Sequence, residues 1–185
     1  MIMKKLTLPL SKEAALSLRA GDTVLLTGAV YTGRDAAHKR LVALLEAGRP
    51  LPFEIAGETI YYVGPAPARP GGVVGPAGPT TSCRMDAYTP PLLSMGLRAM
   101  IGKGSRSRAV IDAMKAAGAV YFGATGGAAA LIARAVKKAE VICYEDLGAE
   151  AVHRFAVEDF PAVVLIDTLG NNLYETGPAA YRAEE

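Results

Sequence analysis

Three apolar, β-prone runs in this sequence each lead through a glycine-bearing turn into a helical pattern, and this alternation constrains the fold most. The runs are Asp22–Val30, Ala99–Gly102 and Ala119–Phe122. Strands that alternate with helices predict a layered α/β domain. The alternation by itself is equally typical of a parallel doubly wound sheet.

The helical patterns and the remaining apolar runs give the other expected elements. One face of the first helix should be buried and consists of four residues, Ala37, Leu41, Leu44 and Leu45, with a stop at Gly48. The second helix should be capped by Ser105 and end near Gly118. Its inward-facing residues are Val110, Ile111 and Met114. An alanine-rich third helix should extend to about Lys138. Further strands are expected at Thr59–Val63, Val141–Tyr144, Phe155–Val157 and Val163–Asp167.

The segment Gly64–Pro79, which reads GPAPARPGGVVGPAGP, is the only break in composition. Its density of proline and glycine excludes a helix and disfavours a strand. Two interpretations are open, a flexible linker or an ordered crossover between two parts of the fold. We favour the crossover, because Val73 and Val74 have the composition of a short strand and the segment leads directly into the richest polar cluster.

Composition limits the kind of protein that this chain can be. Its 185 residues are 51% hydrophobic and 21% charged, which predicts one folded domain over residues 1–185 and excludes a disordered chain. The net charge of +2, without a basic run, gives no reason to expect nucleic acid or an anionic membrane as a partner. No apolar stretch reaches the ~20 residues of a membrane span. The N-terminal segment breaks at Pro9 instead of forming a signal-peptide core, so we expect a cytoplasmic protein.

The two cysteines, Cys83 and Cys143, are far apart and form no metal-binding motif. A structural zinc site or a disulfide scaffold is therefore not expected, and the thiols should be reduced. Two thiols are also too few for a cubane iron–sulfur cluster, which cysteine thiolates normally hold. We therefore expect no metal site within this chain.

Three loops join a predicted strand to a predicted helix: Tyr31–Asp35, Gly102–Arg106 and Gly123–Gly127. Backbone N–H groups at such turns attract anions, so the ligand should be anionic. Glycine is equally common at these turns for reasons of chain geometry. None of the loops matches a dinucleotide or P-loop motif, which leaves a nucleotide-binding function with weak support.

The densest polar cluster is Gly78–Asp86, which reads GPTTSCRMD. It contains Arg84, and a second arginine, Arg34, lies in the first of the three loops. A guanidinium group binds a carboxylate through two parallel hydrogen bonds, so two arginines suit a dicarboxylate. Lys103, between two glycines, adds a compact positive charge that a ligand can approach closely. The alternative is that these three cations are ordinary surface charges.

Six segments of the sequence together resemble a known family. They are YTGRDAAHKRL (31–41), GPTTSCRMD (78–86), MIGKGSRS (100–107), FGATGGAAALIA (122–133), YEDLGAEA (144–151) and DFPAVVLIDTLGNNLY (159–174). In order and spacing they are similar to the β subunit of class I, iron–sulfur-dependent fumarase and L-tartrate dehydratase, which is equivalent to the C-terminal domain of single-chain class I fumarases. The resemblance extends from about Leu8 to Tyr174.

The resemblance implies a hydro-lyase that hydrates fumarate to malate or dehydrates tartrate. It implies an oxygen-sensitive 4Fe-4S cluster whose open iron binds the substrate, held by the cysteines of a separate α subunit and not by this chain. The chain would then be one part of a hetero-oligomer, with a small dicarboxylate as substrate. For this region the family implies a swivelling β/β/α domain.

The family's functional residues fall on four positions of this sequence. The arginines of the YTGRD and TTxxRMD motifs correspond to Arg34 and Arg84, which the resemblance makes substrate-carboxylate ligands. The lysine of the KGxRS motif corresponds to Lys103, a further substrate contact. The first threonine of TTxxRMD corresponds to Thr80, the implied catalytic base. Cys83 occupies a motif position where small residues are more usual, and we assign it no role.

Several questions stay open at the level of sequence. An alcohol needs a neighbouring base to deprotonate it, and none is evident beside Thr80, so this residue either acts as the base or only hydrogen-bonds the substrate. Asp35 and Asp86 are expected to hold the arginines or cap the following helices, whereas His38 is left without a catalytic role. Fumarate, tartrate and mesaconate remain alternative substrates. A stand-alone anion-binding or regulatory module is the alternative function.

Overall fold

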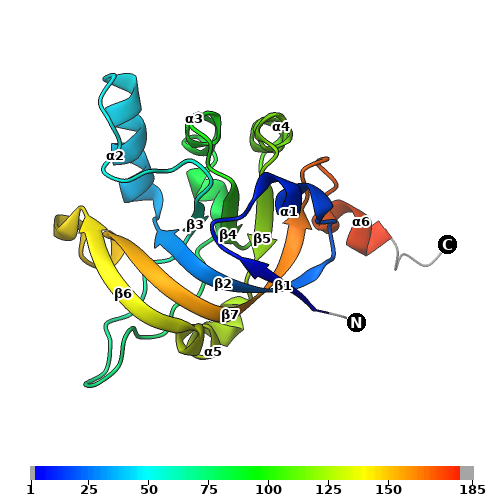
Figure 1. The fold of residues 1–185 in the computed structure, drawn as a ribbon. Helices are drawn as coiled ribbons and strands as arrows, with labels where there is room; N and C mark the ends of the chain where they lie inside the picture. Colours follow the sequence, from blue (N-terminus) through cyan, green and yellow to red (C-terminus); the bar gives the residue numbers. More distant parts are fainter. Residues whose placement is uncertain (1–2, 180–185) are drawn as a thin grey trace.

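A computed structural model describes residues 3–179 of the chain (Figure 1). Seven strands form one sheet, in the order β1–β2–β3–β4–β5–β7–β6. The strands are β1 (Lys4–Thr7), β2 (Thr23–Thr32), β3 (Thr59–Tyr61), β4 (Ala99–Gly102), β5 (Val120–Gly123), β6 (Val136–Cys143) and β7 (Val152–Ile166). The α-helices are α1 (Lys12–Ser17), α2 (Asp35–Glu46), α3 (Thr89–Ser94), α4 (Arg108–Ala117), α5 (Ala129–Ala135) and α6 (Leu173–Ala179). Three 3-10 helices are η1 (Ser82–Met85), η2 (Gly126–Ala128) and η3 (Glu145–Glu150).

The pairing of the strands closes into a ring. β2, β3, β4 and β5 lie next to one another in parallel. β7 runs antiparallel to β5 near its C-terminal end and antiparallel to β2 over most of its length. Because β7 joins both outer strands of the parallel set, these five strands have no free edge between them. β1 adds to β2, and β6 adds to β7 (Figure 1).

Successive side chains of a strand point to opposite faces, and here each face meets its own hydrophobic cluster. One cluster takes a buried side chain from every strand of the ring: Leu26, Tyr61, Ile101, Phe122 and Phe155. The alternate residues Ile60 and Met100 belong to a second cluster, which also contains side chains from α2, α3 and α4. These helices cover one side of the sheet (Figure 1). The prediction of a mixed α/β fold is therefore confirmed.

Two expected helix boundaries were wrong. α4 is capped by Ser107 and not by Ser105, because the Ser107 hydroxyl accepts the N–H of Val110. The alanine-rich helix ends at Ala135, and Lys138 lies in β6, where it pairs with Ala156. Pairing with the long β7 strand thus overrides the local helical composition. The expected end of α4 at Gly118 is confirmed, since Gly118 has a left-handed conformation.

Strand predictions differed from the structure in several places. The expected strand Val141–Tyr144 is the end of the longer β6, which begins at Val136 and stops at Cys143. No strand occurs at Val73–Val74, although this segment lies within the described residues. β1 at Lys4–Thr7 was missed. The runs 155–157 and 163–167, which were expected as separate strands, belong mainly to the single 15-residue β7. An irregularity opposite Leu26 and Gly28 lets β7 continue past the charged pair Glu158-Asp159.

The buried face of α2 is rotated from the predicted one. Ala37 and Leu41 are buried as expected, but His38 and Val42 are buried with them, while Leu44 and Leu45 are only partly covered. None of the helices that the structure describes is both long and apolar enough to cross a membrane.

Candidate functional site

The candidate site lies where the neighbouring parallel strands β2, β3 and β4 end. β2 leads through Gly33 into Arg34 at the start of α2, and β4 leads directly into Lys103. Between them, the chain leaves β3 and enters the Gly64–Pro79 crossover. Carboxyl ends of adjacent parallel strands share one edge of a sheet, and ligands commonly bind outside that edge. The parallel pairing therefore places Arg34 and Lys103, which are distant in sequence, at the same edge of the sheet.

The 80–86 segment is docked directly beside Lys103. Thr81 forms a parallel bridge with Lys103, and the Ser82 N–H donates to the Lys103 carbonyl at 2.9 Å. In return, the Lys103 N–H donates to the Ser82 hydroxyl at 3.1 Å. The backbone N–H of Thr80 donates to the carbonyl of Tyr62, just beyond β3, at 2.7 Å. Thr80 and the exposed Arg84 thus lie on a segment that is fixed against the ends of β3 and β4.

Gly102 makes this docking possible. A Cβ atom at this position would lie 2.0 Å from the Ser82 hydroxyl oxygen and 2.9 Å from the Tyr62 ring. Both distances are shorter than van der Waals contact. The glycine before Lys103 is therefore required because the serine approaches the strand backbone closely, and not because of its backbone dihedral angles.

Arg34 lies on the other side of the crossover entrance. Its side chain packs against Gly64, where a Cβ atom would meet the Arg34 Cδ at 3.1 Å. Arg34 Nη1 forms an ion pair with Glu150 at 3.2 Å, and Arg34 Nε lies 3.8 Å from the Asp35 carboxylate. Asp35 is thus beside this arginine, as expected. Within the described residues, the buried Arg34 Nε has no hydrogen-bond partner.

His38 holds the backbone of this same turn. It is fully buried, and its Nδ1 lies 2.8 Å from the Arg34 carbonyl oxygen, so Nδ1 carries the proton and donates it. Its Nε2 is buried without a hydrogen-bond partner in the part of the chain that the structure describes. Burial lowers the pKa of His38 from 6.5 to about 4, which keeps the ring neutral near pH 7. His38 therefore supports Arg34 through its main chain.

Asp86 holds a different arginine from the one expected. Its Oδ1 accepts from Arg106 Nε at 2.7 Å, and its Oδ2 accepts from the Ser107 N–H at 2.6 Å. Asp86 therefore links the 80–86 segment to the start of α4. No role was expected for Arg106 from the sequence, although this residue lies three positions after Lys103 in the KGSRS motif. Its burial was the missing information, because arginine is rarely buried.

The third glycine-bearing loop, 123–127, is a weaker anion site than its sequence indicates. The Ala124 N–H donates to the Gly102 carbonyl at 2.9 Å, so this amide is already used. A Cβ atom at Gly123 would meet the Leu165 side chain at 2.6 Å, which explains this glycine by packing. The two other loops therefore carry the candidate site.

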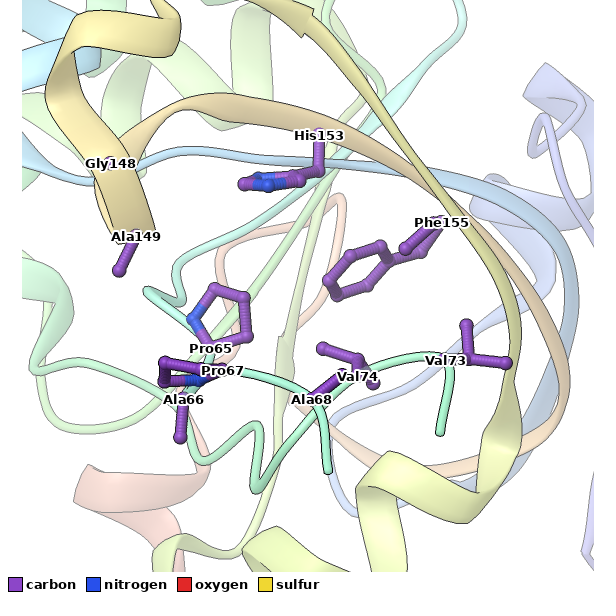
Figure 2. Close-up of a pocket in the computed structure, with 11 residues that line it drawn as sticks. Pro65, Ala66, Pro67, Ala68, Val73, Val74, Gly148, Ala149, His153 and Phe155 are labelled. Carbon is purple, nitrogen blue, oxygen red and sulfur yellow. The ribbon is translucent and has the colours of Figure 1, made fainter. Parts of the chain in front are cut away.

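A cavity of about 260 Å³ lies next to this region, between the crossover and β7. Figure 2 shows His153 and Phe155 facing Pro65 and Val74 across it. Ala149, beside the Arg34 ion pair with Glu150, also lines the cavity. None of the four predicted site residues contributes to its wall, and its lining is largely apolar. This cavity is therefore separate from the four predicted site residues.

Comparison with known proteins agrees with the motifs. The family model described as "Fumarase C-terminus" matches residues 3–177. The anaerobic class I fumarate hydratase of Escherichia coli is 44% identical over 152 residues, covering 81% of this chain and 28% of that protein. Fumarate hydratase 1, mitochondrial, of Leishmania major is 43% identical over the same length, again covering 28% of that protein. The chain thus spans less than a third of these relatives.

A relative of similar size is the putative L(+)-tartrate dehydratase subunit beta of Methanocaldococcus jannaschii. It is 35% identical over 172 residues, which cover 90% of this chain and 88% of that protein. The match of the family model to nearly the whole sequence agrees with the six motif segments. The chain therefore belongs to the Fumarase C-terminus family.

Proposed function

We propose that this chain is the β component of a heteromeric hydro-lyase that reversibly hydrates fumarate to malate or dehydrates tartrate. The observation that carries the proposal is the docking of the Thr80–Asp86 segment on Lys103 at the ends of adjacent parallel strands. This docking sets one guanidinium group and one ammonium group on neighbouring segments. The similarity to a tartrate dehydratase β subunit over most of both chains supports the division into two subunits.

In this proposal three cations bind the substrate carboxylates. Arg84 and Lys103 project from segments held together by the Ser82 hydrogen bonds, so one carboxylate can be bound between them. Arg34 binds the second carboxylate through the terminal guanidinium N–H groups that Glu150 does not occupy. Charge-assisted bonds of this kind hold a dianion in one orientation, and orientation lowers the activation barrier of the chemical step.

Thr80 is the proposed catalytic base. Its backbone is fixed by the Tyr62 carbonyl, and its side chain is half-buried beside the proposed carboxylate site. A threonine hydroxyl takes a proton only if another group has first accepted its own. We propose that this group comes from the α subunit. The alternative is that Thr80 donates a hydrogen bond to the substrate and another residue is the base.

The 4Fe-4S cluster of the proposed enzyme does not fit this chain. Among residues 3–179 there is no group of three or more His, Cys, Asp or Glu side chains that could hold a metal ion. Cys83 is exposed and burial raises the pKa of Cys143 to about 11, which disfavours the thiolate that a cluster needs. We therefore assign the cluster to the α subunit and derive no step of the reaction through it.

The remaining parts of the proposal concern the architecture and the location. We propose that the chain acts as one swivelling β/β/α domain, which the ring of β2, β3, β4, β5 and β7 with α2, α3 and α4 packed on one side supports. We also place the enzyme in the cytoplasm. Neither nucleic acid nor a membrane is a proposed partner.

Anaerobic reconstitution tests the function. This chain, a cysteine-bearing α subunit and their mixture are each assayed for consumption of fumarate, L-tartrate and mesaconate. We expect activity only in the mixture. The diacid that is consumed fastest identifies the substrate, because a single pocket contact of ~1–3 kcal/mol is enough to discriminate between such compounds. If the mixture is inactive on all three while the chain alone binds a diacid, the stand-alone anion-binding module is supported instead. A thermal shift with ATP or NAD would favour a nucleotide-binding function.

A further inference from the structure

We propose that Arg106 is a positioning residue that joins the two loops of the candidate site and so sets the geometry of Arg84 and Lys103. This inference rests on the proposed function. The Arg106 side chain is 0% exposed, although the neighbouring Arg108 is 78% exposed. A charge that is fully removed from water must form specific contacts to be tolerated. Those contacts identify the role.

Arg106 contacts both loops and the sheet beneath them. Its Nε donates to the Asp86 carboxylate at 2.7 Å, and its Nη2 donates to the Thr89 hydroxyl at the start of α3 at 2.8 Å. The guanidinium also lies over two aromatic rings, with its central carbon 5.3 Å from the Tyr62 ring centre and 5.1 Å from that of Tyr121. One side chain thus connects the end of the 80–86 segment, α3, β5 and the residue that follows β3.

The proposed substrate ligands are a few residues away from these contacts. Arg84 precedes Asp86 by two residues, and Lys103 precedes Arg106 by three. Asp86 in addition accepts the Ser107 N–H at 2.6 Å, which fixes the far end of the Lys103 loop. Loss of the Asp86–Arg106 ion pair would therefore let the two loops move independently, which would change the position of Arg84 relative to Lys103. The docking at Ser82 fixes the loops at one end, and this pair fixes them at the other.

Stability alone does not account for a buried arginine at this position. Replacing a buried ion pair by well-packed apolar residues is often neutral or stabilising, because the desolvation of two charges offsets their attraction. The ion pair instead fixes the orientation of the 80–86 segment relative to the loop that carries Arg106, since the N–H donors of the guanidinium lie in one rigid plane. Replacing Arg106 alone leaves the Asp86 carboxylate without this partner and lowers stability, so the test must separate substrate binding from the amount of folded protein.

The test compares Arg106→Met with the matched control Arg108→Met in the reconstituted enzyme. Methionine fills much of the volume without charge, so the loops lose their link but the core stays filled. We expect KM to rise and kcat/KM to fall by about 10- to 100-fold, because small displacements of positioning groups have effects of this size. The control should stay within about twofold, because exposed ion pairs contribute little. With kcat normalised to the amount of folded protein, a KM and a kcat/KM that both stay within about twofold of the wild type would overturn the proposal.

Amide hydrogen exchange gives a second result that does not depend on activity. In Arg106→Met, peptides covering residues 80–88 and 102–108 should exchange at least about tenfold faster, while the strands of the ring keep their rates. Unchanged exchange in these peptides would refute the link between the loops. If the wild-type complex is inactive on every diacid, the proposed function fails, and the exchange result still decides whether Arg106 joins the loops. Asp86→Asn breaks the same ion pair and serves if Arg106→Met does not fold.

Discussion

Acidification should destabilise this protein through His38. In the folded chain the ring is buried and its Nδ1 proton is donated to the Arg34 carbonyl, while Nε2 has no partner among the described residues. Protonation of Nε2 would create a buried charge with an unsatisfied donor. Burial is the main cause of the lowered pKa, the nearby Arg106 charge also lowers it, and Arg34 and Asp35 oppose the shift.

The size of the effect follows from the pKa difference. The pKa of His38 is about 4 in the folded protein and 6.5 when the side chain is unperturbed. Since the unfolded chain binds the proton more tightly, stability is fully present above pH 6.5 and is lost as the pH falls toward 4. Over the whole range this amounts to about 3 kcal/mol, and between about pH 7.5 and 5 to about 2 kcal/mol.

Urea unfolding at these two pH values measures the effect. The wild type should lose about 2 kcal/mol more unfolding free energy on acidification than His38→Asn, whose amide can still donate to the Arg34 carbonyl but does not titrate. His153→Asn is measured in parallel as the matched control for loss of an imidazole, because His153 is the second of the two histidines in the sequence. Equal losses in the wild type and in His38→Asn would refute the assignment of a neutral, buried His38.

Two further predictions follow from close contacts and thiol exposure. Gly102→Ala should lower the free energy of unfolding by about 1–3 kcal/mol, because the methyl group of the alanine would overlap the Ser82 hydroxyl. A melting temperature equal to that of the wild type would contradict this close contact. Of the two free thiols, the exposed Cys83 should be labelled first by iodoacetamide. Burial raises the pKa of Cys143 to about 11, so its thiolate should be roughly 100-fold scarcer than that of an ordinary thiol. Cys83→Ser should therefore remove the fast phase of iodoacetamide labelling. If that phase persists in the variant, its assignment to Cys83 is wrong.

Much of the fold could be predicted because the decisive signals were local. The apolar run at Thr23–Thr32 and the left-handed Gly118 at the end of α4 are both determined by residues within a few positions. The errors occurred where distant pairing decided the structure. Lys138 is in a strand because Ala156 pairs with it, and β7 continues past Asp159 because the β2 register shifts opposite it. Neither the pairing nor the register shift can be predicted from the composition of the segment itself.

The same limit applies to the candidate site. Glycine turns and clustered cations indicated Arg34, Arg84 and Lys103, and the structure explains how strand ends bring their segments to one edge of the sheet. The sequence did not indicate which carboxylate pairs with which arginine. Asp86 was expected to hold an arginine, but burial of Arg106 decides that it is this one. Which arginine an aspartate pairs with depends on which side chains are buried together, and the spacing of residues in the sequence does not show this.

The kinetic effect of Arg84→Lys in the reconstituted enzyme tests the central claim most directly. Lysine keeps the charge but cannot form two parallel hydrogen bonds with a carboxylate. Loss of a charge-assisted bond of about 1.5–3 kcal/mol predicts a fall in kcat/KM of about 10- to 100-fold on the preferred diacid. Arg108→Lys, at an exposed position, should leave kcat/KM within about twofold of the wild type. If Arg84→Lys behaved like this control, Arg84 would not bind the substrate and the dicarboxylate site proposed at this edge of the sheet would be wrong.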